Sequence, residues 1–537
     1  MSAPLAAPLA PPSAAPWSCH THIAIAGDTL IGLGEHHLAR PLDWPLLARI
    51  NHVANPRRIP IGSPLCVPLE RMRSAPRTVQ VLDAVGDTSA HPGDTLQAGQ
   101  RLSTGGNGYI TLQLADGSVV KVQSATEAVL QSSQAYESAG VLRTTWQLLR
   151  GRIESLVTRQ PAAPARFQIQ TPQATLAVRG TEFRVTTQAG LTLAETLAGA
   201  VAVRQGPRQA LVSAGQGTLA DAQSGLTPPR PLPAPPDITG VPTLFERPLI
   251  RIALPPLAAR HRYRVQVADD ADFRRVRAEV DSTEPLVRVA DLPDGGYHWR
   301  VRISDASGLA GADATGQLQL KARPEPPIPT APLSGAKQRT PAIAFGWAQH
   351  PRAHHYQLQV SRNEAFTDLV VDQATLPEPQ FSVPLPPGDY LWRLRTVASA
   401  PPSGTSGIDP GPWGDAQRLI VRAPPASLPA PTLSDTALLF QPQGEPGQRF
   451  EFQLARDAAF HEVLAGASTP ASASPPPVSL PRPDEGGRLY VRYRAIDPDG
   501  YVGPHSSAQT IDLPPCLRSG SGTCVHSGNG QPLQTRP

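Results

Sequence analysis

The sequence of 537 residues has few aromatic residues, no long apolar run and no excess of one charge. Aromatic residues make up 5% of the chain and proline occupies 63 positions, a combination that disfavours long helices. No apolar run approaches the roughly 18 residues of a membrane helix, so no transmembrane span is expected. The 48 Lys and Arg residues nearly balance the 44 Asp and Glu residues and form no basic tract, which argues against nucleic acid as a partner.

The pattern that is present consists of short runs in which Val, Leu, Thr and Arg alternate between Pro and Gly residues. Such runs are typical of strands in all-β proteins, and a chain of this length is expected to form roughly three to five domains. Arginines that alternate with apolar residues, such as Arg300 and Arg302, are expected to face solvent.

Residues 22–68 have the pattern of a strand, two short helices and a second strand. The alternating run His22–Ala26 predicts the first strand, and the Asp28-Thr29 pair can cap the helix that follows. Leucines at helical spacing predict the two helices, which Asn51 can end, and Leu65–Val67 predicts the returning strand. This segment resembles a LysM module, a family that binds glycans containing N-acetylglucosamine, such as peptidoglycan.

The resemblance implies a shallow sugar-binding groove between the loop after the first strand and the loop before the second. The predicted glycan-binding residues are Gly27, Asp28, Thr29, Leu30, Arg58, Ile59, Pro60 and Ile61. Backbone groups and the Asp28 and Thr29 side chains would bond the acetamido group, and Leu30 and Ile59 would pack on its methyl. The alternative is a LysM fold that serves only as a structural cap.

The four cysteines form two pairs in the sequence. Cys19 lies at the approach to the first strand of the LysM-like module and Cys66 lies inside its last strand. These strands are expected to be neighbours, so the geometry allows a disulfide between the two cysteines. Cys516 and Cys524 could close a small loop in a Gly/Ser-rich tail. Paired placement favours an oxidising compartment, although four unrelated thiols remain the alternative.

Residues 78–218 contain closely spaced short strands with glycine corners. Asp116-Gly117 between apolar runs predicts a hairpin with a type I′ turn. That hairpin, the Leu149-Arg-Gly151 step, the stretch Val178–Phe183 and the closing Gly215-Gln-Gly217 resemble the FecR domain. The resemblance implies a right-handed stack of short strands.

The namesake of the FecR family is a periplasmic regulator that relays a signal from an outer-membrane transporter. That relay also needs a cytoplasmic anti-sigma segment and a membrane helix, which this sequence is not expected to supply, so the sigma-regulator role does not carry over. Arg179 and Glu182 could form a functional pair. We expect them instead to pair with each other and to satisfy a strand corner.

The C-terminal half repeats at intervals of 93 and 94 residues. Tyr263–Phe273 is echoed by Tyr356–Phe366 and Phe450–Phe460. The copies resemble fibronectin type III or immunoglobulin-like modules, which implies β-sandwiches with Trp299 and Trp392 in their cores and Arg and Gln facing water. Trp413 could cap a sandwich or lie on an exposed loop.

Catalytic and metal-binding patterns are weak. Ser118 and Lys121 have the Ser-x-x-Lys spacing but lie in a predicted strand, where the two side chains would not meet as they do on a helix. His36 and His37 would diverge on a helix, and the acidic run 497–500 is expected to be a hairpin turn rather than a calcium loop. We therefore expect no enzyme activity, no catalytic residue, no metal and no cofactor.

The predicted fold class is mainly β and multidomain: a small βααβ LysM-like module, a FecR-like stacked β domain and three β-sandwich repeats. The predicted segments are a leader or disordered segment 1–19, the glycan-binding module 20–70, the FecR-like domain 78–220, a Pro-rich linker 226–238, sandwich repeats 239–322, 333–422 and 432–514, and a disordered tail 515–537. The Pro-rich linker is expected to be a semi-rigid polyproline II spacer.

The domain content predicts a periplasmic or cell-envelope protein that binds peptidoglycan or another N-acetylglucosamine-containing glycan and acts as a scaffold or adaptor for an envelope protein partner. Export is inferred from the domains, since residues 3–17 are interrupted by prolines and follow no basic region. The alternatives are a periplasmic signalling or sensor component that uses the FecR-like domain, and a non-catalytic subunit of a wall-remodelling system. A wall hydrolase would need a catalytic domain, and all large segments resemble non-catalytic ones.

Overall fold

The computed structural model describes residues 19–159, 167–178, 180–339, 342–399, 407–423, 427–434, 436–472, 474–514, 517, 519–521, 525–528 and 533. The chain divides into two compact units, Met1–Lys321 and Ala322–Pro537. Strands predominate in both units, so the prediction of a mainly β, multidomain protein is confirmed. No helix within the described ranges is long and apolar enough to cross a membrane.

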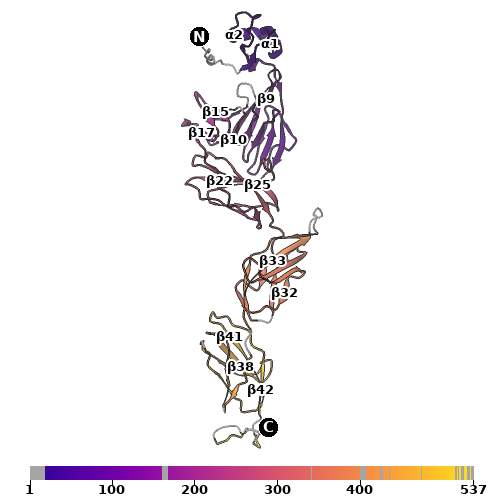
Figure 1. Ribbon diagram of the computed structural model, residues 1–537, viewed down its shortest axis with the longest axis vertical. Helices are drawn as coiled ribbons and strands as arrows, with labels where there is room; N and C mark the ends of the chain where they lie inside the picture. Colours follow the sequence, from indigo (N-terminus) through magenta and orange to yellow (C-terminus); the bar gives the residue numbers. More distant parts are fainter. Residues whose placement is uncertain are drawn as a thin grey trace, which may run out of the picture. The chain divides into compact units, whose positions relative to one another are not determined.

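The LysM-like module has the predicted order of strand, helix, helix and strand (Figure 1). Its elements are β1 (Cys19–Ile23), α1 (Leu30–His37), the 3-10 helix η1 (Pro41–Asp43), α2 (Trp44–Ile50) and β2 (Pro64–Pro68), followed by the 3-10 helix η2 (Leu69–Arg71). Strands β1 and β2 are antiparallel, with Thr21 opposite Cys66. Both helices pack their leucines against β2, and this places the loop that follows β1 beside the loop that precedes β2.

The FecR-like region follows without a break. Its elements are β3 (Ala75–Pro76), β4 (Val79–Val85), β5 (Thr95–Leu96), β6 (Arg101–Ser103), β7 (Tyr109–Gln113), β8 (Val119–Val122), β9 (Glu127–Tyr136), the 3-10 helix η3 (Glu137–Ala139), β10 (Val141–Leu156), β11 (Phe167–Gln170), β12 (Thr175–Val178), β13 (Glu182–Gln188), β14 (Leu191–Ala198), β15 (Ala200–Gln205), β16 (Arg208–Ser213), β17 (Gln216–Asp221), β18 (Gly225–Leu226) and β19 (Arg230–Pro231). Its apolar side chains form one continuous core.

Successive hairpins of this region alternate between two sheets, which gives the stacked arrangement that the resemblance implies. In one sheet β11 pairs with β12, β12 with β15 and β15 with β16. In the other, β13 pairs with β14 and β14 with β17. The long strand β10 belongs to both, because its first half pairs with β9 and β11 and its second half with β8 and β13. Gly151 marks the change with a φ of +89°, and a Cβ there would lie 2.5 Å from the Thr126 backbone.

The predicted hairpin at Asp116-Gly117 joins β7 to β8, but its turn differs from type I′. Gly117 has a φ of +81°, whereas Asp116 is not among the residues with positive φ. Leu114 N–H donates to Ser118 O (2.9 Å) across a longer loop, and the Asp116 carboxylate accepts from Ser118 N–H (3.0 Å). The loop length removes the need for a second positive φ.

The Pro-rich segment after residue 225 is not a free spacer. Leu226 pairs with Ala220 of β17, and Arg230 pairs with Gly217 of the same strand. Leu232 N–H then donates to Gly215 O (2.9 Å). The prediction of a polyproline II spacer is therefore wrong for this stretch, because its backbone groups extend the FecR-like sheet instead of remaining hydrated.

The first sandwich belongs to the same compact unit. Its strands are β20 (Leu244–Phe245), β21 (Ile250–Ala253), β22 (Arg262–Ala268), β23 (Val276–Ser282), β24 (Leu286–Val289), β25 (Gly295–Ser304) and β26 (Ala314–Leu320). They form a sheet ordered β20-β26-β25-β22-β23 and a facing pair, β21-β24. Tyr263 and Trp299 are buried, which confirms the core predicted from the repeats.

Arg300 and Arg302 of β25 are buried rather than solvent-facing, so that prediction is wrong. Arg300 donates to Glu154 Oε2 (2.8 Å), and Arg302 NH2 lies 2.8 Å from Glu154 Oε1. Asp313 pairs with both guanidinium groups. The polar face of this sandwich lies against strand β10, so its arginines meet carboxylates instead of water.

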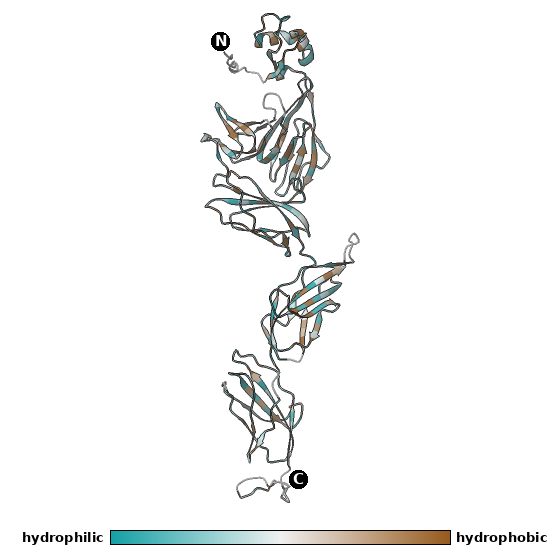
Figure 2. Ribbon diagram, viewed as in Figure 1, coloured by the Kyte–Doolittle hydropathy of each residue, from teal (hydrophilic) through white to brown (hydrophobic). Residues whose placement is uncertain are grey.

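The second unit contains two further sandwiches. The strands of the second are β27 (Pro329–Ala331), β28 (Ala336–Gln338), β29 (Ile343–Trp347), β30 (His355–Ser361), β31 (Leu369–Leu376), β32 (Gln380–Val383), β33 (Gly388–Ser399), β34 (Ile408–Pro410) and β35 (Gln417–Val421). The strands of the third are β36 (Thr432–Leu433), β37 (Ala437–Phe440), β38 (Arg449–Ala455), β39 (Val463–Ser468), β40 (Val478–Pro481), β41 (Gly487–Ile496) and β42 (Gln509–Leu513). Figure 2 shows the alternation of hydrophobic and hydrophilic residues along such strands.

The cores of these two sandwiches contain the residues expected from the repeats. Trp392 is buried in the second, as predicted, and Tyr493 in the third. Trp413 lies half-buried over the surface of the second sandwich, where the guanidinium carbons of Arg393 and Arg395 are each 4.5 Å from its ring centre. Of the two open alternatives, it therefore caps the sandwich.

Candidate glycan-binding site

Two loops of the LysM-like module run side by side. Ala24 N–H donates to Ser63 O (3.0 Å), and Gly62 N–H donates back to Ala24 O (2.7 Å). Leu30 N–H donates to Pro56 O (3.4 Å) at the other end of the pair. These bonds hold residues 25–29 against residues 55–62, so the structure brings together the two segments predicted to form the groove.

The Asp28 and Thr29 side chains mainly shape the first loop. Asp28 Oδ2 accepts from Ile25 N–H (2.8 Å) and lies 2.7 Å from His22 Nε2, and these two contacts lower the pKa of Asp28. Thr29 Oγ1 caps helix α1 by accepting from Gly32 N–H (3.0 Å), as predicted. Direct bonds from these two side chains to a sugar remain a prediction, and the structure shows them engaged within the loop.

Leu30 does not line the groove through its side chain. It is 1% exposed and packs in the core with Leu33 and Leu65. The prediction that Leu30 packs on an acetamido methyl is therefore wrong for this conformation, because the first residue of α1 points into the module. Ile59 is half-buried against the same core.

Three isoleucines provide the exposed apolar surface of the two loops and the helix start. Ile61 is 72% exposed, Ile25 64% and Ile31 45%. Of these, the sequence prediction contained only Ile61. Ala24, a small residue, faces inward, and the large Ile25 follows it. A large apolar residue next to a small inward-facing one is the sequence signal that could have identified Ile25.

The remaining predicted groove residues lie on the surface of these loops. Gly27 is exposed with a φ of +94°, and Arg58 and Pro60 are exposed in the second loop. Arg58 N–H donates to Asn55 O (3.0 Å), and Ser63 Oγ donates to Pro60 O (2.7 Å), so this loop is folded back on itself.

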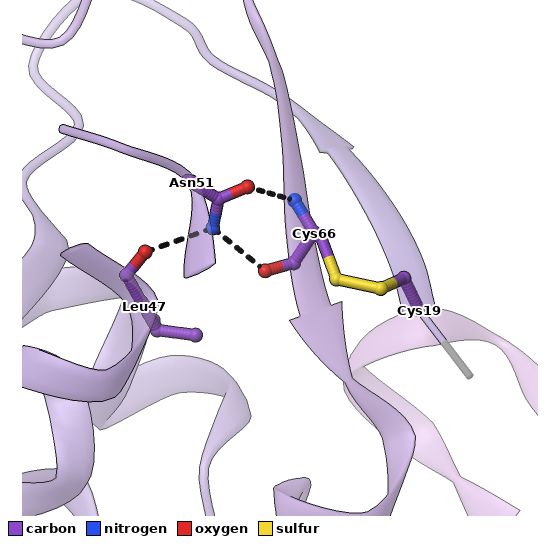
Figure 3. Close-up of a disulfide and its surroundings, with 4 residues drawn as sticks. All are labelled: Cys19, Leu47, Asn51 and Cys66. Carbon is purple, nitrogen blue, oxygen red and sulfur yellow. Dashed lines mark hydrogen bonds between the residues drawn. A yellow bond between two sulfur atoms is a disulfide. The ribbon is translucent and has the colours of Figure 1, made fainter. Parts of the chain in front are cut away.

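A disulfide and one asparagine fix the ends of the second loop (Figure 3). Cys19 and Cys66 are joined by a disulfide across β1 and β2. Asn51 Nδ2 donates to Leu47 O (2.9 Å), which ends α2, and to Cys66 O (2.8 Å), while Asn51 Oδ1 accepts from Cys66 N–H (2.6 Å). One side chain therefore connects the helix to the strand on which the loop ends. The predicted pair Cys516 and Cys524 lies outside the described residues.

Comparisons with known families match two parts of this chain. The LysM domain family matches residues 22–68, and the FecR protein family matches residues 100–202. The chain carries a LysM domain and a FecR domain. Both are non-catalytic families and are typical of envelope proteins, and LysM domains bind peptidoglycan and related glycans.

Solved structures also resemble parts of the chain. A "putative anti-sigma factor" from Parabacteroides distasonis is 18% identical with a TM-score of 0.21, covering 25% of this chain and 59% of that one. Chicken CNTN1 FN1-FN3 domains are 14% identical with a TM-score of 0.19, covering 52% of this chain and 98% of that one. This chain thus spans less than two thirds of the first structure. No curated protein matches it.

The LysM domain is attached to the FecR domain through a shared core. Tyr136 and Val141, on either side of η3, pack with the leucines of the LysM domain. His37 at the end of α1 is 2% exposed, and its Nδ1 lies 3.0 Å from Ser138 Oγ of η3. Burial, and then the neighbouring His36, His20 and His22, lower the pKa of His37 to about 4.

The weak catalytic and metal motifs do not assemble into sites. Ser118 Oγ accepts from Thr158 N–H (3.0 Å), whereas Lys121 donates to Asp272 O, so the two side chains serve different contacts. Asp497 and Gly500 form the predicted turn, in which Gly500 N–H donates to Asp497 O (2.9 Å). Among the described residues, no group of three or more His, Cys, Asp and Glu side chains is placed to hold a metal.

The proposed pair at the FecR corner can be described only in part. Glu182 is exposed at the start of β13. Arg179 lies outside the described residues, so the pairing of these two side chains stays a prediction.

Proposed function

We propose that this protein is a non-enzymatic, periplasmic cell-envelope protein that binds peptidoglycan, or another glycan containing N-acetylglucosamine, through its LysM domain. The FecR domain and the sandwiches serve as a scaffold or adaptor for an envelope protein partner. The domain limits given by the sequence, apart from the linker 226–238, are part of this proposal.

The observation that supports glycan binding is the exposed apolar surface on the paired loops. Ile25 and Ile61 lie on the two loops, and Ile31 is the second residue of α1. Exposed apolar groups beside polar backbone suit a sugar, because its acetamido methyl is apolar and its hydroxyl and amide groups need hydrogen bonds. Exposed backbone at Gly27 and Gly62 leaves room for close approach.

The scaffold part of the proposal follows from the size of the site. A single shallow module buries little area, so its affinity for one glycan chain is expected to be weak. Peptidoglycan presents many copies of the same sugar, and several proteins held by a common partner would gain affinity through effective concentration. A chain with three further sandwiches has ample surface for such a partner.

The experiment is co-sedimentation of the purified protein with peptidoglycan sacculi. The test variant is Ile25→Ser/Ile61→Ser, which removes apolar surface from both loops without touching the core. The control is Leu42→Ser, since Leu42 is 87% exposed and lies in η1, outside both loops.

We expect wild type and Leu42→Ser to pellet alike, and the double variant to lose at least about ten-fold in affinity. Retention of full pelleting by the double variant would place the binding surface elsewhere. A folded wild-type protein that does not pellet with sacculi would contradict glycan binding by the LysM domain.

A further inference from the structure

A cavity of about 340 Å³ lies between the FecR domain and the first sandwich, within one compact unit. Strands β10, β13 and β14 form one wall, and β22, β25 and the following turn form the other. Six of its lining residues are arginines: Arg152, Arg184, Arg260, Arg262, Arg264 and Arg302. This volume is at the lower end of the range of small-molecule sites.

The carboxylates of the lining are already engaged. Glu154 accepts from Arg300 (2.8 Å) and pairs with Arg302 (2.8 Å). Glu195 accepts from Ala310 N–H (2.7 Å). Asp305 accepts from the Ser307 N–H and hydroxyl inside its own turn. Each of these three carboxylates therefore already has a partner within the protein.

Several donors of the cavity remain available. Arg260 and Arg262 are exposed, and their guanidinium groups make no hydrogen bond or ion pair with any residue that the structure describes. Arg262 interacts at longer range with Asp281, whose pKa it helps to lower. Arg184 is 5% exposed, and its Nε donates no hydrogen bond, although Glu154 Oε1 lies 3.6 Å away. A buried guanidinium N–H without an acceptor is costly, because it has lost its hydration.

The backbone at the rim is also unusual. Arg260 has a φ of +62°, a conformation that is rare for a residue with a long side chain. Such strain persists where the surrounding structure fixes it, and it is concentrated at functional sites. The adjacent strand β22 carries Arg262 and Arg264 on one face, with Tyr263 buried between them.

We propose that this cavity binds a small multivalent anion, a ligand bearing a phosphoryl or carboxylate group, through Arg260 and Arg262 at the rim and the Arg184 Nε in the interior. A ligand that accepts hydrogen bonds suits this site, because Arg260, Arg262 and the Arg184 Nε are donors. Guanidinium groups match the oxygens of such anions in bidentate fashion. Partial burial raises the strength of each charge-assisted bond relative to water.

The test is isothermal titration calorimetry of the full chain with inorganic phosphate and, separately, with succinate. Ionic strength is kept constant with sodium chloride, so that general screening does not imitate binding. The test variant is Arg260→Gln/Arg262→Gln. The control is Arg204→Gln/Arg251→Gln, which removes the same charge from exposed positions of the same unit that do not line the cavity.

We expect saturable binding in wild type and in the control, and at least a ten-fold weaker affinity in the test variant. Arg260→Gly provides a second test, because glycine suits the positive φ and removes only the side chain; it should also weaken binding. Tighter binding of phosphate assigns a phosphoryl ligand, and tighter binding of succinate assigns a carboxylate.

Absence of saturable binding of both anions to wild type would overturn the proposal, as would equal losses in the test and control variants. Neither anion contains a sugar, so the outcome is independent of glycan binding. Sacculi binding by Arg260→Gln/Arg262→Gln is expected to be unchanged, because the cavity lies outside the LysM domain.

Discussion

The first and second sandwiches contain the same three-residue cluster in different surroundings. In the first, Arg300 lies 4.5 Å from the Phe273 ring centre, and its Nε donates to Gln266 Oε1 (2.7 Å). In the second, Arg393 lies 3.9 Å from the ring centre of Phe366, and its Nε donates to a glutamine at the equivalent position (3.0 Å). The phenylalanines have positive φ values of 54° and 55°.

The difference lies in what covers the arginines. In the first sandwich, the FecR domain covers Arg300 and Arg302 and presents Glu154 to both. In the second sandwich, Trp413 covers Arg393 and Arg395 as a cation–π platform. The repeat itself determines how arginine, glutamine and phenylalanine pack together, and the neighbour determines whether the charges are buried. One repeat has thus become an interdomain surface.

The largest effect is expected from breaking the buried cluster. Arg302→Ala should lower the free energy of unfolding of the first unit by about 3–5 kcal/mol, because it leaves Glu154 and Asp313 buried without one of their cationic partners. Urea unfolding followed by hydrogen exchange of β10 and β25 peptides would locate the loss in this unit. Arg395→Ala in the second sandwich should cost about 1 kcal/mol or less, since that arginine is half-exposed.

Equal losses in these two variants would contradict the comparison, because they would mean that burial against the FecR domain adds nothing. Faster exchange in peptides of the second unit of the Arg302→Ala variant would also contradict it. The measurement needs exchange data for separate peptides, since a chain of several domains does not unfold in one two-state step.

The second prediction compares the two sides of the FecR domain. Its contact with the LysM domain includes His37, which is buried and uncharged, whereas its contact with the first sandwich is charged. Burial lowers the pKa of folded His37 to about 4, against about 6.5 when unfolded. The unfolded state therefore binds more protons between these values, so the LysM contact should lose about 2 kcal/mol as the pH falls from 7 to 5.

The charged contact should respond at lower pH. Burial alone would raise the pKa of Glu154, but Arg300, Arg302 and Arg184 together hold it well below its usual range. Its contribution is present above the unfolded pKa near 4.5 and is lost only as the pH falls below that value. Hydrogen exchange of α1 and of β25 at pH 7 and pH 5 would separate the two. In His37→Asn, whose side chain does not titrate, the exchange rate of α1 should no longer rise between pH 7 and pH 5. An equal rise in the exchange rate of β25 in the wild-type protein would contradict the assignment of the effect to His37.

The sequence was sufficient to predict most of the fold but not the contacts between domains. Alternation and turn residues identify strands, and the repeat of Tyr263–Phe273 identifies the sandwiches, because these signals are local. The burial of Arg302 depends on a carboxylate nearly 150 positions away, Glu154, and no local pattern distinguishes it from the half-exposed Arg395. The same limit explains the Pro-rich segment, whose pairing with β17 is decided by the neighbouring sheet.

The candidate site was predicted to the level of its loops rather than its side chains. The family resemblance placed residues 27–30 and 58–61 in the groove, and the structure brings these loops together. It could not show that Leu30 points inward, because the first residue of a helix can face either the core or the loop. As a result, the prediction missed Ile31, the next residue of the helix, which is exposed in place of Leu30.

A smaller effect than that of Arg302→Ala is expected from uncovering the arginines of the second sandwich. Trp413→Ala should lower the stability of the second unit by about 1–2 kcal/mol, since two cation–π contacts and one half-buried ring are lost. Arg393 keeps its bonds to Gln359 and its place over Phe366, so the cluster itself should persist. Hydrogen exchange of β33 would show a uniform, modest rise in rate. A loss of stability as large as that of Arg302→Ala would contradict this comparison. It would mean that the Trp413 cap stabilises the second sandwich as much as the interdomain contact with the FecR domain stabilises the first.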